Sequence, residues 1–472
     1  MPGRMSRARE SLSRRRGSEP VARLDNYLAP ADEALLAEHR AAGMAVVIQV
    51  TWRYEHRVDL DGVHRFHQHL SQGLLGRRIE RPALPIARHR WVADRRPTEF
   101  DIAAGPRPRA EFSDWVDERS QLPIDPQAGP GWHLGLQPLD DGSTAISLVL
   151  SHNLIDGLGL ALVIAEAALG KSRDLGYPPP LSRTKLRALG ADARQTVRDV
   201  PEAIRAVATA AKLARKQARE QRTKGRAPAS RSAAPVATVG GDDTVLVPMI
   251  TIYVYLDQWD ARAEALGGGS HTLAAAFAAK LGERIGRLRA EDGAVTLQIP
   301  ISDRTEDDTR AMALSYTRVS VDPAPLTKEL ADIRAAIKKT LRTMKETPDE
   351  SKQLLWLSSF MPERAMKRMV AKMPADPDQS VFCSYLGDLH TAIGCPDGTI
   401  VEYGNARGTG QRESRQLLDR IGGRMMVLSG RINGKIFLSV GAYQPGATNT
   451  KAALRAVAAH TLDDFGLTGV VD

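Results

Sequence analysis

The chain has 472 residues, of which 42% are hydrophobic and 26% are charged, and its formal net charge is +9. This length is too great for a domain with one ordinary hydrophobic core and suits two lobes of about 200 residues each. The composition is that of an ordinary soluble protein and excludes a largely disordered or membrane-spanning chain. Cys383 and Cys395 are too few for a disulfide scaffold, so we expect a reducing, cytoplasmic setting.

The positive charge is concentrated in two segments. Residues 1–20 carry six Arg and two Glu, and residues 205–231 carry nine Lys or Arg and one Glu, so these segments hold +12 and the remainder sums to −3. No nucleic-acid partner is therefore predicted. We interpret residues 1–20 as a disordered basic tail. Solvated charge is the simplest reading of both segments, and peripheral contact with an anionic membrane or lipid-droplet surface is the alternative.

The N-terminal lobe is predicted over residues 21–180. A strand is expected at Met44–Trp52, followed by a helix with apolar residues at near-helical spacing from Leu60 to Leu74. The run Thr144–Leu150 (TAISLVL) is typical of a buried strand. A basic interlobe crossover is expected over residues 181–243, with a helix at Ala203–Arg222.

The C-terminal lobe is predicted over residues 244–472, as strands and helices without a strict alternation. Asn433-Gly434 predicts a hairpin turn. This mixture favours α/β architecture built as mixed-sheet α+β sandwiches. The expected strands are Thr244–Leu256 (broken or bulged at Pro248), Val295–Ile301, Leu314–Val321, Ser380–Ser384, Arg424–Ser429 and Lys435–Ala442. One helix is expected to begin near Thr272, with an apolar stripe that reaches Leu288, and two others are expected at Thr327–Met344 and Lys451–Phe465.

The segment Ser151–Gly157 (SHNLIDG) carries the chemistry, because it joins the buried strand to an apolar helix. A neutral imidazole can take a proton from an attacking hydroxyl near neutral pH, which makes His152 the candidate general base. Asp156 can brace the loop, and Gly157 permits a close backbone approach. The alternative is a structural histidine satisfied by a neighbour, with Asp156 capping the next helix.

This segment resembles the His-His-x-x-x-Asp-Gly signature of bacterial wax ester synthase/diacylglycerol acyltransferases, peptide-synthetase condensation domains and polyketide-associated acyltransferases. Flanking segments resemble the lipid branch in the same order: Arg23-Leu24-Asp25, Pro123–Leu136, Gly268–Gly282 and Ile299–Arg304. The sequence departs from the pattern at Ser151, which replaces the first His, and at Ser315-Tyr316 and Ser384–Gly387.

The resemblance implies two chloramphenicol-acetyltransferase-like lobes with an active-site tunnel between them. It implies an O-acyltransferase without a covalent acyl-enzyme, in which His152 deprotonates the acceptor and Asp156 pairs with an arginine, for which Arg304 is the candidate. Ser384 or a backbone N–H near Gly157 is the candidate oxyanion donor, and Asn153 is a further candidate for substrate binding. No cofactor or metal is expected beyond an acyl-CoA or acyl-carrier-protein thioester as co-substrate.

Lipid ester formation is the favoured reaction, with a hydroxyl acceptor. Two alternatives stay open. One is condensation-type acyl or amide transfer on carrier-bound substrates in natural-product or glycolipid synthesis, with a hydroxyl or amine acceptor, and the other is a non-catalytic relative that binds a lipid or a partner. Other motifs are set aside. His64, His67 and His69 are expected on a solvated helix edge rather than at a metal, Gly404–Gly410 (GNARGTG) as a plain loop, and Asp464-Phe465-Gly466 as a helix end.

Overall fold

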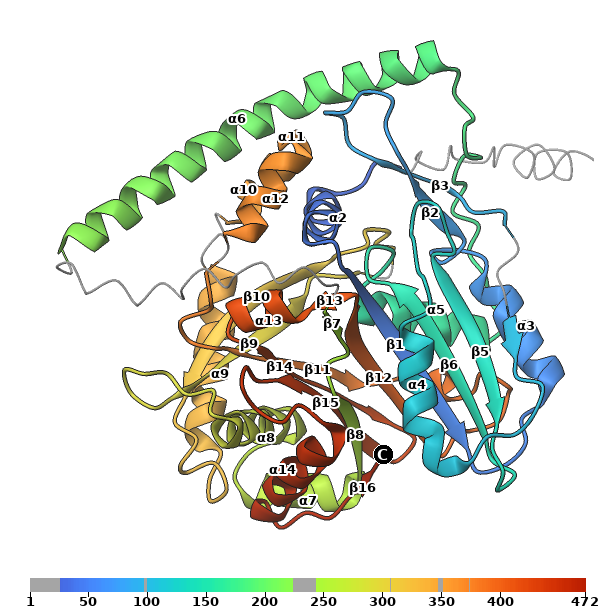
Figure 1. Ribbon diagram of the computed structural model, residues 1–472, viewed down its shortest axis with the longest axis vertical. Helices are drawn as coiled ribbons and strands as arrows, with labels where there is room; N and C mark the ends of the chain where they lie inside the picture. The colour runs from blue at the N-terminus through green and yellow to red at the C-terminus, as the bar shows by residue number, and fades with distance from the viewer. Residues whose placement is uncertain (1–25, 97–99, 224–242, 306, 347–350, 373) are drawn as a thin grey trace, which may run out of the picture.

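A computed structural model describes residues 26–472 except 97–99, 224–242, 306, 347–350 and 373. Its N-terminal part is organised around a five-stranded sheet with the order β12-β1-β6-β5-β4 (Figure 1). All neighbours are antiparallel except β4 and β5. The strands are β1 (Ala45–Tyr54), β4 (Phe100–Ile102), β5 (Trp132–Pro138), β6 (Thr144–Ser151) and β12 (Tyr403–Gln411). The last of these comes from far along the chain and adds an edge strand beside β1.

Alternate residues of β1 point to opposite faces of this sheet, as strand geometry requires. Ile48, Val50 and Trp52 belong to the core formed with helices α3 (Leu60–Leu70) and α5 (Gly157–Ala168). Val47 packs in a smaller cluster on the other side, and Gln49 donates to the Val116 carbonyl of α4 (Phe112–Ser120). Both faces of the sheet are therefore covered.

The second, seven-stranded sheet has the order β10-β9-β11-β14-β15-β8-β16 and mixes parallel and antiparallel neighbours. Helix α8 packs on this sheet, and its residues Leu273 to Ala279 and Leu281 are almost completely buried in the largest core. The strands are β8 (Met249–Tyr255), β9 (Val295–Ser302), β10 (Leu314–Val321), β11 (Val381–Asp388), β14 (Arg424–Ile432), β15 (Lys435–Tyr443) and β16 (Val470–Val471), and the helices around them are α7 (Leu256–Ala265), α8 (Ser270–Ile285), α9 (Ala331–Glu346) and α14 (Lys451–Asp464).

Helix α6 (Lys185–Thr223) crosses one side of the molecule as a single long element (Figure 1). It contacts α10 (Ser351–Leu354) and α11 (Trp356–Phe360), while α11 and α12 (Glu363–Ala371) contact α2 (Pro30–Ala42). The remaining elements are β2 (Arg77–Glu80), β3 (Arg90–Ala93), β7 (Thr244–Val245), β13 (Glu413–Ser414), α13 (Arg415–Arg420), η1 (Arg109–Glu111) and η2 (Thr391–Gly394). Within the described residues, no helix is both long enough and apolar enough to cross a bilayer.

The expected mixed α/β architecture is confirmed, and several local signals are correct. The predicted strand around Pro248 is interrupted between β7 and β8. Asn433 and Gly434 both have positive φ, at 46° and 77°, in the hairpin between β14 and β15. Helix α14 ends at Asp464, and Gly466 follows with φ of 64°.

Other expectations are wrong. Gly404–Gly410 is not a loop but lies within β12. Its glycines have weak strand propensity, and pairing with β1 holds the segment in the strand conformation. The crossover helix begins at Lys185 rather than Ala203 and continues through Pro201. Leu74 and Leu288 lie beyond the ends of α3 and α8, because each helix stops before the apolar periodicity does. Residues 1–20, Arg23-Leu24-Asp25 and residues 224–242 lie outside the described residues.

Candidate active site

The candidate motif occupies the turn between β6 and α5. The strand ends at Ser151, whose N–H donates to the Gly131 carbonyl at 3.0 Å, and the next N–H, of His152, donates to the Val46 carbonyl at 2.9 Å. Ser151 is completely buried, and its hydroxyl accepts a hydrogen bond from the Asn153 N–H at 3.3 Å. The serine that replaces the first histidine of the resembled motif therefore serves the turn itself.

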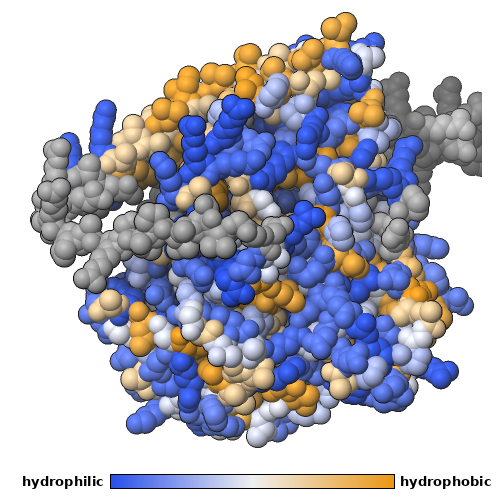
Figure 2. Space-filling model, in the orientation of Figure 1, coloured by the Kyte–Doolittle hydropathy of each residue, from blue (hydrophilic) through white to orange (hydrophobic). Residues whose placement is uncertain are grey.

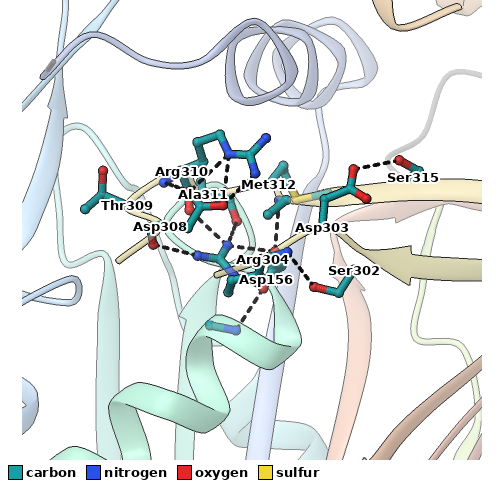
Figure 3. A network of polar contacts seen from close by, with 12 residues as sticks. Asp156, Ser302, Asp303, Arg304, Asp308, Thr309, Arg310, Ala311, Met312 and Ser315 are labelled. Atoms are coloured by element: carbon teal, nitrogen blue, oxygen red, sulfur yellow. Dashed lines mark hydrogen bonds and ion pairs between the residues drawn. The ribbon is translucent and has the colours of Figure 1, made fainter. Parts of the chain in front are cut away.

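Asp156 is fully buried and forms a two-point ion pair with Arg304, the partner expected from the resemblance (Figure 3). Arg304 Nη2 lies 2.7 Å from Asp156 Oδ2, and Arg304 Nε lies 3.0 Å from Oδ1. The carboxylate also accepts from the N–H groups of Gly159 and Ala313, each at 2.9 Å. Asp156 thus caps α5, as the structural alternative proposed, and also joins α5 to the segment after β9.

Arg304 is held from its other side by backbone carbonyls. Its guanidinium donates to the carbonyls of Asp308, Arg310 and Ala311 at 2.9 to 3.1 Å (Figure 3). All three guanidinium nitrogens are therefore engaged, which holds this planar group in one orientation. This network fixes the position of the motif loop relative to the seven-stranded sheet.

Asp32 on α2 tethers the same segment and was not predicted. It is buried, and it accepts from the Met312 N–H at 2.7 Å and the Ala311 N–H at 3.2 Å. Burial raises the pKa of its carboxyl to about 6. The segment around residue 312 is therefore bound both by Asp32 of α2 and by Asp156.

A cavity of about 670 Å³ lies between the two sheets. His152, Gly157 and Ser384 all line it, so three of the predicted site residues share one space. Most of the lining is apolar and comes from β1, α5 and β14, with Ile48, Trp52, Leu160, Ile164 and Leu428 as examples. Glycines of β12, Gly404 and Gly408, line it without filling it, a use of this segment that the sequence did not suggest.

The surroundings of His152 keep its imidazole neutral. Burial lowers the pKa of His152, and the nearby Asp156 carboxylate only partly offsets this effect. Among the described residues, its Nδ1 has no hydrogen-bond partner. A neutral, cavity-lining imidazole is the protonation state that a general base requires.

His39 is a second histidine at the cavity, and sequence reasoning missed it. It lies near the end of α2, and its Nδ1 accepts from the Asn153 side-chain amide at 3.0 Å. Burial, with a smaller contribution from His152, lowers the pKa of His39 to about 4. The signals for α2 were Pro30 and two acids at its start and Gly43 at its end. Asn153 thus contacts His39 and lines an adjacent pocket.

That second pocket measures about 470 Å³ and shares His39 with the main cavity. Three arginines, Arg40, Arg81 and Arg412, line it together with one carboxylate, Asp125, so its lining carries a net positive charge. The pKa of Arg40 is lowered by burial and next by the positive charge of Arg81. The pocket is therefore a cationic compartment beside an apolar one.

The histidine cluster on α3 has aromatic neighbours. The rings of His64 and His67 lie 5.0 and 5.6 Å from that of Phe100. Within the part of the chain that the structure describes, no three His, Cys, Asp or Glu side chains gather in a way that could hold a metal ion. The cluster is thus packed against aromatic side chains.

A scan against protein-family models found no match, and neither did a search of curated proteins. Solved structures do match over nearly the whole chain. The first condensation domain of the CDA synthetase aligns with a TM-score of 0.53 at 13% identity, over 94% of this chain and 99% of that domain. A wax ester synthase/diacylglycerol acyltransferase from Marinobacter aquaeolei VT8 aligns with a TM-score of 0.52 at 14% identity, over 94% of this chain and all of that one.

A further match is the first condensation domain of the calcium-dependent antibiotic synthetase in complex with a substrate analogue, with a TM-score of 0.53 at 14% identity over 93% of this chain and 95% of that one. At these identities the likeness concerns the fold. The chain therefore has the fold of these condensation domains and of this wax ester synthase/diacylglycerol acyltransferase, as the motif resemblance predicted.

Proposed function

We propose that this protein is an O-acyltransferase that moves an acyl group from a thioester to a hydroxyl acceptor, with His152 as the general base. The observation that carries the proposal is a histidine with a lowered pKa lining a largely apolar cavity between the two sheets. Open space beside His152 favours catalysis over the binding-only alternative, for which bulky side chains would fill the groove.

In the proposed reaction both substrates are bound together. The acceptor hydroxyl attacks the thioester carbonyl carbon while His152 takes the hydroxyl proton, and a tetrahedral oxyanion forms. When the oxyanion collapses, the carbon–sulfur bond breaks, the ester is released, and the imidazolium returns the proton to the departing thiolate. Proton transfer of this kind contributes about 10²–10⁴-fold to a rate. No covalent acyl-enzyme is formed.

The oxyanion requires a hydrogen-bond donor, worth about 3 kcal/mol in such sites. Ser384 on β11 and the backbone at Gly157 are the candidates, because both line the same cavity as His152. Gly157 is the first residue of α5, where the positive end of the helix dipole favours negative charge. Asn153 is not proposed as an oxyanion donor, because its side-chain amide donates to His39 instead.

The lining of the cavity supports a lipid substrate. Apolar side chains from β1 and α5, among them Val46, Val50 and Ala161, line the cavity together with His152. Burying each methylene of an acyl chain or a fatty alcohol there is worth about 0.8 kcal/mol. We therefore favour lipid ester formation of the wax ester or triacylglycerol type.

The adjacent arginine pocket supports the identity of the donor. Arg40 and Arg81 repel one another, so a phosphate between them would relieve this repulsion and gain charge-assisted hydrogen bonds. Coenzyme A and the phosphopantetheine arm of a carrier protein both carry phosphate at one end of a pantetheine chain and the acyl thioester at the other end. Because His39 lines both spaces, we propose that the donor crosses from the arginine pocket into the apolar cavity at this residue.

The test is to incubate the purified protein with acyl-CoAs of several chain lengths and with long-chain alcohols, diacylglycerol and amines. Free thiol and product mass are measured together, and intact protein mass is recorded for any acyl adduct. Ester formation without an adduct supports the proposal. Product only with amines or carrier-bound donors would favour the condensation alternative, and absence of product from any pair would favour the binding-only alternative.

A further inference from the structure

Helix α6 is fastened to the molecule by its polar face. Asp192 is buried and accepts from the N–H groups of Ala83 at 2.7 Å and Leu84 at 3.2 Å. Asp199 is also buried and pairs with Arg88, at 2.9 and 3.3 Å. Gln353 of α10 donates to the Glu202 carboxylate at 3.0 Å. These contacts orient the helix about its own axis.

A second face of α6, about a quarter turn from these contacts, is apolar and exposed, whereas the usual amphipathic helix buries its apolar face. Leu186 is 83% exposed, Val197 70%, Ile204 64% and Val207 59%. Residues 197, 200, 204 and 207 are spaced by three and four, so they form one stripe along the helix. Figure 2 shows this stripe as a hydrophobic band along the outer edge of the molecule. From Leu186 to Val207 it runs for about 32 Å.

Arginines accompany the stripe. Arg187, Arg194, Arg198 and Arg205 are exposed and share one side of the helix next to it at 100° per residue. The acidic residues described on α6 are engaged elsewhere, because Asp192 and Asp199 are buried and Glu202 bonds to Gln353 and Arg205. A second copy of α6 would thus offer the same arginines and no acidic row to meet them. An apolar stripe flanked by cations is complementary to an anionic lipid surface.

We propose that α6 docks this protein on an anionic membrane surface, with the stripe of Val197, Val200, Ile204 and Val207 immersed among the lipids and the arginines at the headgroups. The polar contacts of Asp192 and Asp199 keep the stripe facing outward in the free protein. This inference stands apart from the proposed acyl transfer, since it requires no turnover.

The experiment is flotation of the full-length protein with vesicles of phosphatidylcholine alone or with about 30% phosphatidylglycerol. Two α6 variants are compared: an apolar one with Val197→Ser, Ile204→Ser and Val207→Ser, and a charge one with Arg187→Gln, Arg194→Gln and Arg198→Gln. A matched control carries Ile400→Ser, Leu288→Ser and Ile102→Ser, three exposed apolar residues outside α6. Urea unfolding verifies that every variant is folded.

The proposal predicts binding to the anionic vesicles and little to the neutral ones, weakened by salt. Each α6 variant should bind at least about tenfold more weakly, whereas the control should bind like the wild type. Equal binding by the α6 variants would overturn the proposal, because the affinity would then reside elsewhere in the chain. Absence of binding by folded wild-type protein would also overturn it, as would a dimer in solution that the apolar variant dissociates without any vesicle binding.

Discussion

Asp156 and Arg304 are 148 residues apart in the chain, yet they form a two-point ion pair in which neither side chain is more than 3% exposed. The pair joins the start of α5 to the segment after β9, so it holds the His152 loop against the other sheet. Its energetic importance follows from burial, because removing one member leaves an uncompensated charge.

Asp156→Asn should therefore lower the free energy of unfolding by about 3–5 kcal/mol, measured by urea denaturation. The control is Arg342→Gln, which breaks the exposed Arg342–Glu346 pair and should cost less than about 1 kcal/mol. Equal losses in the two variants would contradict the role assigned to the pair.

Ala161 lies on α5 and lines the cavity, whereas its neighbour Leu162 is 39% exposed and lies outside the cavity lining. Ala161→Phe should shorten the preferred acyl or alcohol chain, because the larger side chain occupies space that methylene groups would fill. Leu162→Phe should leave the preference unchanged. The measurement is kcat/KM across a series of chain lengths, and a series unaltered by Ala161→Phe would refute the proposed chain path.

The arginine pocket predicts a donor effect that depends on phosphate. In a variant with Arg81→Gln and Arg412→Gln, the KM for acyl-CoA should rise by about five- to tenfold. The KM for the matching N-acetylcysteamine thioester, which lacks phosphate, should not change. Arg420→Gln, an exposed arginine of α13, is the control. An equal rise in KM for both donors would mean that the pocket does not bind the phosphate of the donor.

Burial lowers the pKa of His39 from 6.5 to about 4. Between pH 4 and pH 6.5, His39 is therefore largely protonated in the unfolded chain and largely neutral in the folded protein. The contribution of His39 to stability is complete above pH 6.5 and is lost as pH falls toward 4. Asp32 acts in the opposite direction, because its raised pKa gives stability at low pH that is lost as pH rises through about 6.

The difference in unfolding free energy between the wild type and His39→Gln reports the effect of His39 alone, because both proteins retain Asp32. The stability advantage of the wild type over the variant should shrink by about 2 kcal/mol between pH 7 and pH 5. Urea denaturation at the two pH values measures this difference. An advantage that is constant or larger at pH 5 would show that His39 is not held neutral.

The parts of the fold that could be predicted are those specified by neighbours in sequence. The apolar stripe of α8 and the Asn433-Gly434 turn are local signals, and both are present. Strand β12 could not be predicted, since Gly404 to Gly410 has weak strand propensity and is ordered by pairing with β1. The predicted helix began at Ala203, but α6 extends back through Pro201 to Lys185, and the polar contacts of Asp192 and Asp199 hold this first part of the helix.

The site residues also divide into those that a local sequence motif indicates and those that only the packing of distant segments brings together. His152 and Asp156 share a short motif, and Arg304 was expected only through the family resemblance. His39 and Asp32 reach the site through the packing of α2 against distant segments, which leaves no spacing signal in the sequence. The shared cavity likewise depends on side chains from both sheets.

The most direct test of base catalysis by His152 is the rate of ester formation by His152→Ala at saturating acyl thioester and alcohol. The matched control is His460→Ala, an exposed histidine on α14. If His152 is the general base, His152→Ala should lose at least about 100-fold in rate with unchanged folding, and the control should lose none. A His152→Ala enzyme within about twofold of the wild-type rate would contradict the assignment of His152 as the base.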